Sequence, residues 1–141
     1  MTEVTFYTFV PDKLAIMRQL AVKAYGQKLN VLIHTSDPSL AASLDLMLWT
    51  SPALSFLPHC RDSDSIAGHT PILIGVDADK LVRADVLINM DEQYPTQFSR
   101  FDRLLEIVTA DENARAKGRE RYKFYQERGY TINTHDMRNA N

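Results

Sequence analysis

The sequence predicts a single α/β domain built on an open, mainly parallel sheet with helices on both faces. Short apolar segments of the kind that form buried strands alternate along the chain with segments whose apolar residues recur every three or four positions, as in helices. The 141 residues contain no internal repeat and no low-complexity linker. We therefore expect residues 1–137 to fold as one unit and residues 138–141 to form a frayed tail.

The first half of the chain predicts two strand-then-helix units. The alternating, β-branched and aromatic segment Val4–Val10 is expected to be a strand. A helix should follow over Pro11–Gly26, because its apolar residues share a face and glycine commonly ends helices. The nearly all-apolar segment Asn30–His34 predicts a strand covered on both faces. Pro38, a good first helical residue, opens a helix expected to reach Trp49.

The second half predicts three more strands and a final helix. Pro71–Gly75 and Asp85–Asn89 are apolar enough to be buried strands. The segment Gln97–Val108 is mixed, and we expect a helical start and a strand over Leu104–Val108. The last helix is expected over Glu112–Arg128, followed by a glycine that stops it. This order of elements is typical of parallel sheets whose helices cross over the faces.

The glycines argue against a nucleotide site in this sheet. A phosphate cradle needs glycines in the first turn between strand and helix, so that backbone N–H groups can approach the phosphates. That turn is expected at Phe9–Asp12 and contains none, and the five glycines of the chain match neither the dinucleotide nor the P-loop spacing. We expect no cofactor.

Other catalytic or metal-binding chemistry does not assemble either. The four histidines are scattered, without the paired spacing that holds zinc. His59 and Cys60 are adjacent, but neighbouring side chains rarely face each other, so a loop histidine and a small buried cysteine are the better interpretation. Asp77, Asp79 and Asp85 lack the loop spacing of a calcium site and are interpreted as a solvated connection. These residues therefore predict no metal site and no catalytic constellation.

Composition narrows the class of partner. A net charge of −2 argues against strong electrostatic binding of DNA. No apolar run approaches the roughly 18 residues of a membrane span, the N-terminus does not resemble a signal peptide, and one cysteine fits a reducing compartment. We expect a cytoplasmic protein that does not contact a membrane.

One candidate contact surface lies on the helix that starts at Pro38. At 100° per residue, one side of this helix is the expected core face, formed by Leu40, Leu44, Met47 and Leu48. The opposite side carries Ala42, Leu46 and Trp49, and Phe56 in the following segment is expected to join it. Either this patch binds a partner protein or a neighbouring part of the chain covers it.

A second candidate surface lies on the last helix. Arg115, Arg119 and Lys123 fall on one line beside Tyr122, because spacings of three, four and seven share a helix face. The side expected to lie on the sheet carries Ala114, Gly118 and Tyr125, and the side facing away carries Glu120, Phe124 and Glu127. Three interpretations remain open for the basic line: nucleic acid, an acidic peptide, or a solvated helix face.

Several short motifs resemble the chi subunits of bacterial DNA polymerase III. They include the TFY start of the first strand, Leu48-Trp49, the segment Ser55–His59, and Asp85–Asn89. The most specific is the RERYKxY motif at Arg119–Tyr125, together with the glycine, asparagine and threonine downstream of it. The loop Arg61–Thr70 and the residues after Met137 depart from the family pattern.

The resemblance implies a non-catalytic adaptor with a Rossmann-like fold and no nucleotide site. It implies that the chain binds the acidic C-terminal tail of single-stranded DNA-binding protein through Val108, Arg115, Arg119, Tyr122, Lys123 and Gly129. A separate surface would bind the psi subunit of the clamp loader, or a helicase-like repair protein, through Trp49 and Phe56. DNA would be contacted only indirectly, near the nucleoid. The alternative is a small α/β enzyme or binding protein for a nucleotide or phosphorylated molecule.

Overall fold

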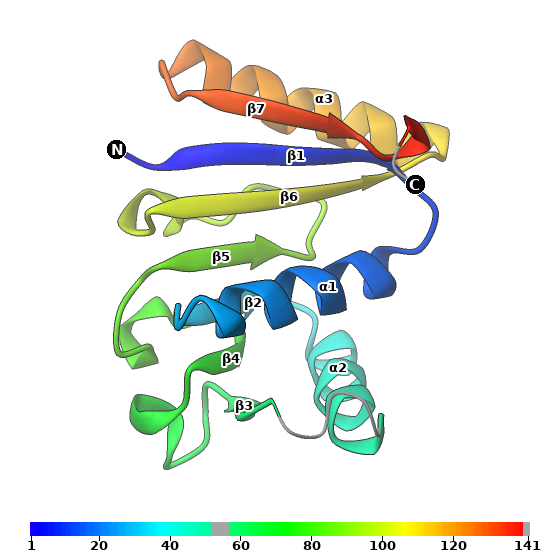
Figure 1. The fold of residues 1–141 in the computed structure, drawn as a ribbon. Helices are drawn as coiled ribbons and strands as arrows, with labels where there is room; N and C mark the ends of the chain where they lie inside the picture. Colours follow the sequence, from blue (N-terminus) through cyan, green and yellow to red (C-terminus); the bar gives the residue numbers. More distant parts are fainter. Residues whose placement is uncertain (52–56, 140–141) are drawn as a thin grey trace.

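A computed structural model describes residues 1–51 and 57–139 (Figure 1). Its seven strands are β1 (Glu3–Val10), β2 (Val31–His34), β3 (His59–Arg61), β4 (Ile72–Gly75), β5 (Val86–Asn89), β6 (Arg103–Thr109) and β7 (Ile132–Asp136). The α-helices in the described residues are α1 (Lys13–Gly26), α2 (Pro38–Thr50) and α3 (Glu112–Glu127). Short 3-10 turns occur in the connections and after β7, at Ala67–His69, Ala78–Lys80, Phe98–Arg100 and Met137–Asn139.

The strands form one open sheet in the order β3-β4-β2-β5-β6-β1-β7. Every neighbouring pair runs parallel. The predicted class is therefore confirmed, and the sheet is parallel throughout. β1 and β2 are adjacent in the sequence but separated by β5 and β6, because α1 carries the chain across the sheet.

Helices cover both faces of the sheet, as predicted. One hydrophobic core joins α1 and α2 to one face, through residues such as Met17, Leu44 and Ile33. On the other face, α3 packs through Tyr125 against Phe6 and its neighbours. In Figure 1, α1 crosses in front of the sheet and α3 lies behind β7 and β1. Because successive side chains of a strand point to opposite faces of the sheet, the strands contribute residues to two separate hydrophobic cores.

Aspartates start all three helices. Asp12 accepts hydrogen bonds from the backbone N–H groups of Leu14 and Ala15, and Asp37 accepts one from Ser39, with Pro38 in the first turn. Asp111 accepts from the N–H of Ala114. These side chains satisfy amides that have no partner inside the helix.

The structure corrects three local predictions. β3 contains His59, which was expected in a loop, and Arg61, which was expected to open the following polar loop. β7 was not predicted as a strand, because it is short, polar and exposed along the edge. The segment starting at Gln97 forms only a single 3-10 turn before β6.

The C-terminal end is held further than expected. Arg138 was placed in the frayed tail, but it lies in a 3-10 turn and forms an ion pair with Asp136. Residues 140–141 lie outside the described part of the chain.

Asp85 is a buried structural residue, which corrects its interpretation as part of a solvated connection. Its Oδ2 accepts hydrogen bonds from the backbone N–H of Asn30 at 2.8 Å and from the Asn30 amide at 3.2 Å. Its Oδ1 lies 3.3 Å from a guanidinium nitrogen of Arg83. Burial pushes the pKa of Asp85 upward, but these donors outweigh it and the pKa lies below its ordinary value.

Asp85→Asn is expected to lower the free energy of unfolding at pH 7 by about 1 kcal/mol, since it removes a charged acceptor. The wild-type carboxylate has its lowered pKa only when folded, so its contribution is present above the unfolded pKa near 3.9. That contribution is lost as the pH falls through the folded pKa. Urea titrations at pH 7 and at about pH 3 should therefore show the two proteins converging in acid, and a constant difference would contradict this.

Candidate protein-binding site

The outer side of α3 carries the predicted basic line. Arg115, Arg119, Tyr122 and Lys123 are all exposed, whereas Gly118 and Tyr125 are buried against the sheet. These positions agree with the predicted faces of the helix. Phe124 does not face away as expected; it is half-buried and stacks on Tyr94, with ring centroids 3.8 Å apart.

A pocket of about 230 Å³ opens between α3, β1, β6 and β7. Four of the residues predicted from the family resemblance line it together: Val108, Arg115, Arg119 and Tyr122. The remaining lining residues are Phe6, Thr8, Phe9, Gly118 and Thr134. Of the predicted set, Lys123 and Gly129 do not line it. Most of the surface inside the pocket is apolar, with two guanidinium groups among its walls.

Phe9 reaches this pocket because β1 is irregular there. Its φ is 54°, in the left-handed region that non-glycine residues rarely occupy, and the pairing of β1 with β6 shifts register between Tyr7 and Val10. An unbroken strand would turn Phe9 toward α1. The bulge turns it to the α3 side instead, next to Thr8 in the pocket.

Gly118 allows α3 to approach β6 closely. A Cβ atom built on Gly118 would lie 2.8 Å from Cγ2 and 3.1 Å from Cγ1 of Val108. Real Cβ atoms do not sit at the shorter of these distances. The glycine therefore sets the depth of the pocket, with Val108 behind it.

The cations around the pocket differ in their partners. The side chain of Arg119 makes no hydrogen bond or ion pair with any residue of the described ranges 1–51 and 57–139. The Arg115 guanidinium lies 4.9 Å from the centroid of the Phe9 ring, and that of Arg138 lies over the same ring at 3.6 Å. The ammonium of Lys123 lies 3.9 Å from Glu127, an exposed pair that contributes little to stability. Arg119 is thus the pocket cation most available to an external anion.

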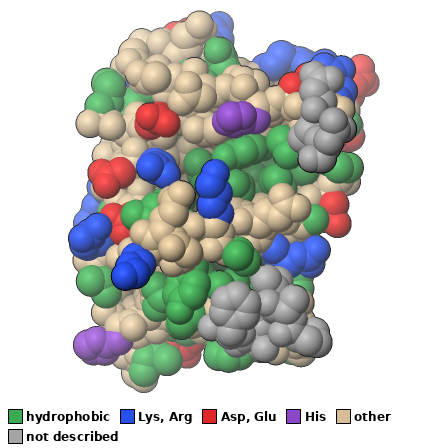
Figure 2. All heavy atoms as spheres, viewed as in Figure 1, with side chains coloured by type: hydrophobic (Ala, Val, Ile, Leu, Met, Phe, Trp, Pro, Cys, Tyr) green, Lys and Arg blue, Asp and Glu red, His purple; other side chains and the backbone are tan. Residues whose placement is uncertain are grey.

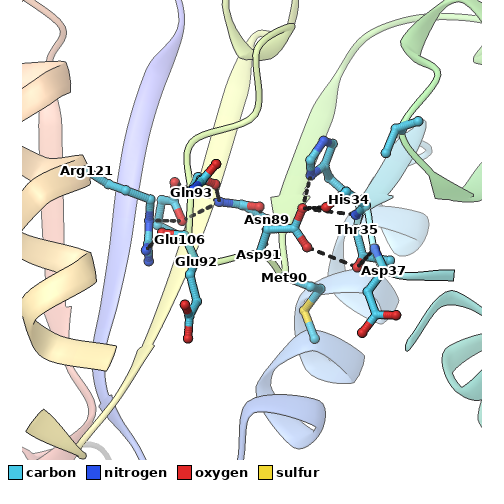
Figure 3. Close-up of polar contacts among 12 residues, drawn as sticks. His34, Thr35, Asp37, Asn89, Met90, Asp91, Glu92, Gln93, Glu106 and Arg121 are labelled. Carbon is cyan, nitrogen blue, oxygen red and sulfur yellow. Dashed lines mark hydrogen bonds and ion pairs between the residues drawn. The ribbon is translucent and has the colours of Figure 1, made fainter. Parts of the chain in front are cut away.

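Between α3, β5 and β6 lies a buried polar network that the sequence did not predict. Glu106 in β6 is fully buried and accepts hydrogen bonds from Arg121 Nε at 3.0 Å, Tyr125 Oη at 2.6 Å and Asn89 Nδ2 at 3.0 Å. Figure 3 shows Asn89 and Arg121 converging on Glu106. Arg121 also donates to the backbone carbonyl of Glu92. The network fixes α3 against β5 and β6.

Burial dominates the ionisation of this network. It raises the pKa of Glu106, whereas Arg121, Tyr125 and Asn89 act in the opposite direction. The pKa of Tyr125 is raised strongly, first by burial and then by the neighbouring Glu106 carboxylate. The hydroxyl of Tyr125 therefore remains a donor over the range of pH in which proteins are folded.

The second predicted surface is also exposed. On α2, the side chains of Leu46 and Trp49 are 64% and 53% exposed, and Ala42 is exposed beside them. Leu44 and Leu48 face the core on the other side. No described residue buries Leu46 or Trp49, whereas residues 52–56, which follow α2 in the sequence, lie outside the described part of the chain. Phe56, the other residue predicted here, lies outside the described residues.

A further hollow was not predicted. A groove of about 340 Å³ lies beside α1, over β6, β1 and β7, where no helix covers the sheet. Its lining includes Lys23, Arg103 and Glu3, and the Tyr7 and His135 rings stack within it at 5.2 Å between centroids. Figure 2 shows hydrophobic side chains over β1 and β6 on this face, with both basic and acidic ones around them. The mixed lining does not indicate one class of ligand.

The described histidines, cysteine and carboxylates are arranged as follows. Within residues 1–51 and 57–139, no three His, Cys, Asp or Glu side chains come together to hold a metal ion. Cys60 is buried, and burial is the main factor that raises the pKa of its thiol. The ring of His59 contacts Leu57 and Asp45. No helix among the described residues is long and apolar enough to cross a membrane.

Comparison with known proteins covers nearly the whole chain. The family model described as "DNA polymerase III chi subunit, HolC" matches residues 1–133. The DNA polymerase III subunit chi of Pseudomonas aeruginosa is 29% identical, over 97% of this chain and 98% of the relative. That of Escherichia coli K12 is also 29% identical, over 95% and 97%, and that of Haemophilus influenzae is 28% identical, over 92% and 90%. The chain therefore belongs to the family of DNA polymerase III chi subunits, HolC, which are non-catalytic accessory subunits of that polymerase.

Proposed function

We propose that the α3 pocket binds the acidic C-terminal tail of single-stranded DNA-binding protein and thereby holds the polymerase assembly at DNA that this protein coats. The observation that supports this most directly is the apolar pocket with Arg119 in its wall, a cation whose side chain has no partner among the described residues. Such a site suits a peptide that ends in a hydrophobic residue next to carboxylates.

The dimensions of the pocket fit one aromatic side chain. Its volume of about 230 Å³ exceeds the roughly 150 Å³ of an apolar cavity known to accept benzene. Phe6, Val108 and Tyr122 supply apolar walls for such a ring. We assign Arg119 to the terminal carboxylate of the peptide.

The remaining assignments concern the acidic residues that precede the end of the peptide. Arg115 lines the pocket, and Lys123 lies two turns further along α3, so both can pair with aspartates that extend from it. The proposed role of Gly129 is conformational. Its φ of 80° follows the last turn of α3 and ends the helix beyond the basic line.

Arg119→Ala is expected to weaken binding of an acidic peptide ending in Pro-Phe by about tenfold or more, because a hydrogen-bonded charge pair contributes about 1.5–3 kcal/mol. Isothermal titration calorimetry at two salt concentrations measures this, and higher salt should also weaken wild-type binding. Arg128→Ala is the matched control, since Arg128 is exposed near the end of the same helix but lies outside the pocket. Equal affinities for wild type and Arg119→Ala would refute the assignment.

We propose further that the exposed patch on α2 binds the psi subunit of the clamp loader. Trp49 and Leu46 present a large apolar area on a helix whose opposite side already fills the core. Exposed aromatic residues of this kind are common anchors of protein interfaces. The chain would then link two proteins in the cytoplasm, near the nucleoid, and contact DNA only through them.

A further inference from the structure

The patch on α2 contains a carboxylate whose environment is unusual. Asp45 is the only charged residue of α2, and helical geometry places it on the same side as Ala42, Leu46 and Trp49. Its side chain is 28% exposed. No lysine or arginine of the described residues forms an ion pair with it. A lone negative charge therefore lies among the exposed apolar side chains of this surface.

The residue beneath Asp45, His59, makes no hydrogen bond with it. His59 Nδ1 lies 2.6 Å from the backbone carbonyl of Leu57, and a carbonyl can only accept, so this nitrogen carries a hydrogen. With its hydrogen on Nδ1, a neutral ring presents Nε2 as an acceptor, whereas a protonated ring would pair with the carboxylate. At 3.8 Å from Asp45 Oδ1, Nε2 makes no hydrogen bond with it.

Both of these atoms are buried and unsatisfied. Neither His59 Nε2 nor Asp45 Oδ1 has a hydrogen-bond partner in the described part of the chain. The His59 side chain is fully buried, and the Trp49 ring lies over it with centroids 4.1 Å apart. Unpaired buried polar atoms are unfavourable. Within residues 1–51 and 57–139, this surface thus holds a carboxylate with one buried oxygen unpaired, next to the exposed ring of Trp49.

Other charged groups lie around Cys60, the residue next to His59 in β3. The carboxylates of Asp62 and Asp64 lie close enough to act on Cys60 together with Asp45. Arg61 follows Cys60 in the chain, and its Nε also lacks a hydrogen-bond partner within the described residues. Three carboxylates therefore act on Cys60 in the edge strand β3.

We propose that the protein bound at this surface presents a lysine or arginine side chain to Asp45, with apolar residues on Leu46 and Trp49. The proposal rests on the proposed role of the α2 patch in binding the psi subunit. An ammonium or guanidinium group donates hydrogen bonds to a carboxylate, and it also binds favourably over an indole ring. One cation beside an apolar segment would match both features of the surface.

Asp45→Asn tests this proposal with two readouts. The asparagine amide can donate an N–H to His59 Nε2, so we expect the melting temperature to rise by about 3 °C. The affinity for the psi subunit of the same organism should nevertheless fall by about tenfold, and Asp45→Lys should weaken it further. Asp102→Asn is the matched control, because Asp102 is exposed and its side chain has no partner among the described residues.

The outcomes separate this proposal from the one on which it rests. If Trp49→Ala binds the psi subunit as wild type does, the α2 patch is not its binding site. If Trp49→Ala weakens binding while Asp45→Asn and Asp45→Lys bind normally, the surface is correct and the cation is wrong. Support requires a loss of affinity in both Asp45 variants. In addition, one lysine or arginine of the psi subunit should lose its contribution once Asp45 is replaced.

Discussion

Arg121→Met is expected to lower the free energy of unfolding by about 3–5 kcal/mol, because it leaves the Glu106 carboxylate buried without its cation. Glu106 is completely inaccessible and Arg121 is 5% exposed, so water cannot replace the lost partner. Urea denaturation followed by circular dichroism measures the change. Replacing an exposed arginine of α3, Arg115 or Arg119, is not expected to lower the free energy of unfolding by a similar amount.

Arg119→Met provides the comparison for Arg121→Met. It makes the same chemical change two residues away on the exposed side of the helix and should alter stability by no more than about 0.5 kcal/mol. The double variant Glu106→Met with Arg121→Met should recover much of the loss, since apolar residues can replace a buried ion pair. A loss below about 1 kcal/mol in Arg121→Met would mean that Tyr125 and Asn89 alone satisfy the carboxylate.

Gly118→Ala is expected to reduce both stability and peptide binding. Alanine favours a helix by up to about 1 kcal/mol over glycine, but its Cβ would meet Val108 Cγ2 at 2.8 Å. Val108 is buried and β-branched, so it has little freedom to turn away. Overpacking of this kind typically costs about 1–3 kcal/mol, and we expect a net loss of about 1–2 kcal/mol. Displacing α3 should also weaken binding of the acidic peptide severalfold.

Gly26→Ala is the control for this substitution. A Cβ at Gly26 meets no atom within 4 Å, so alanine there should leave stability unchanged or slightly higher. Adding Val108→Ala to Gly118→Ala should relieve the overlap and restore part of the stability. Chemical denaturation and peptide titration of the four proteins provide the comparison. If Gly118→Ala alone increased the free energy of unfolding, α3 would have to move away from Val108 at a small cost in free energy.

Much of the fold was predictable because its signals are local. Apolar runs identified β2, β4 and β5, and helical periodicity identified which side of α2 is buried. β7 was not predicted because it is short, polar and at the edge of the sheet, so it lacks the apolar pattern by which buried strands are recognised. β3 was not predicted because three residues carry too little pattern.

The candidate pocket was predictable only in part. Helical spacing placed Arg115, Arg119 and Tyr122 together, but Phe9 joins them through a bulge that reverses the alternation of β1. Arg121 was missed because a charged residue on a basic helix suggests exposure to solvent. A signal was nevertheless present: Glu106 interrupts the apolar strand around it, and a buried acid requires a buried partner.

The two faces of the sheet have one more consequence. α2 contacts β3 and β4 near one edge, whereas the α3 pocket opens beside β1 and β7 at the other edge, on the opposite face. Ligands at the two proposed surfaces would not compete for space, so both could be held at once. Where the two ligands are themselves connected by short flexible segments, binding of the first makes the second encounter intramolecular, at about millimolar effective concentration. Two contacts that are weak individually would then give a complex that dissociates slowly.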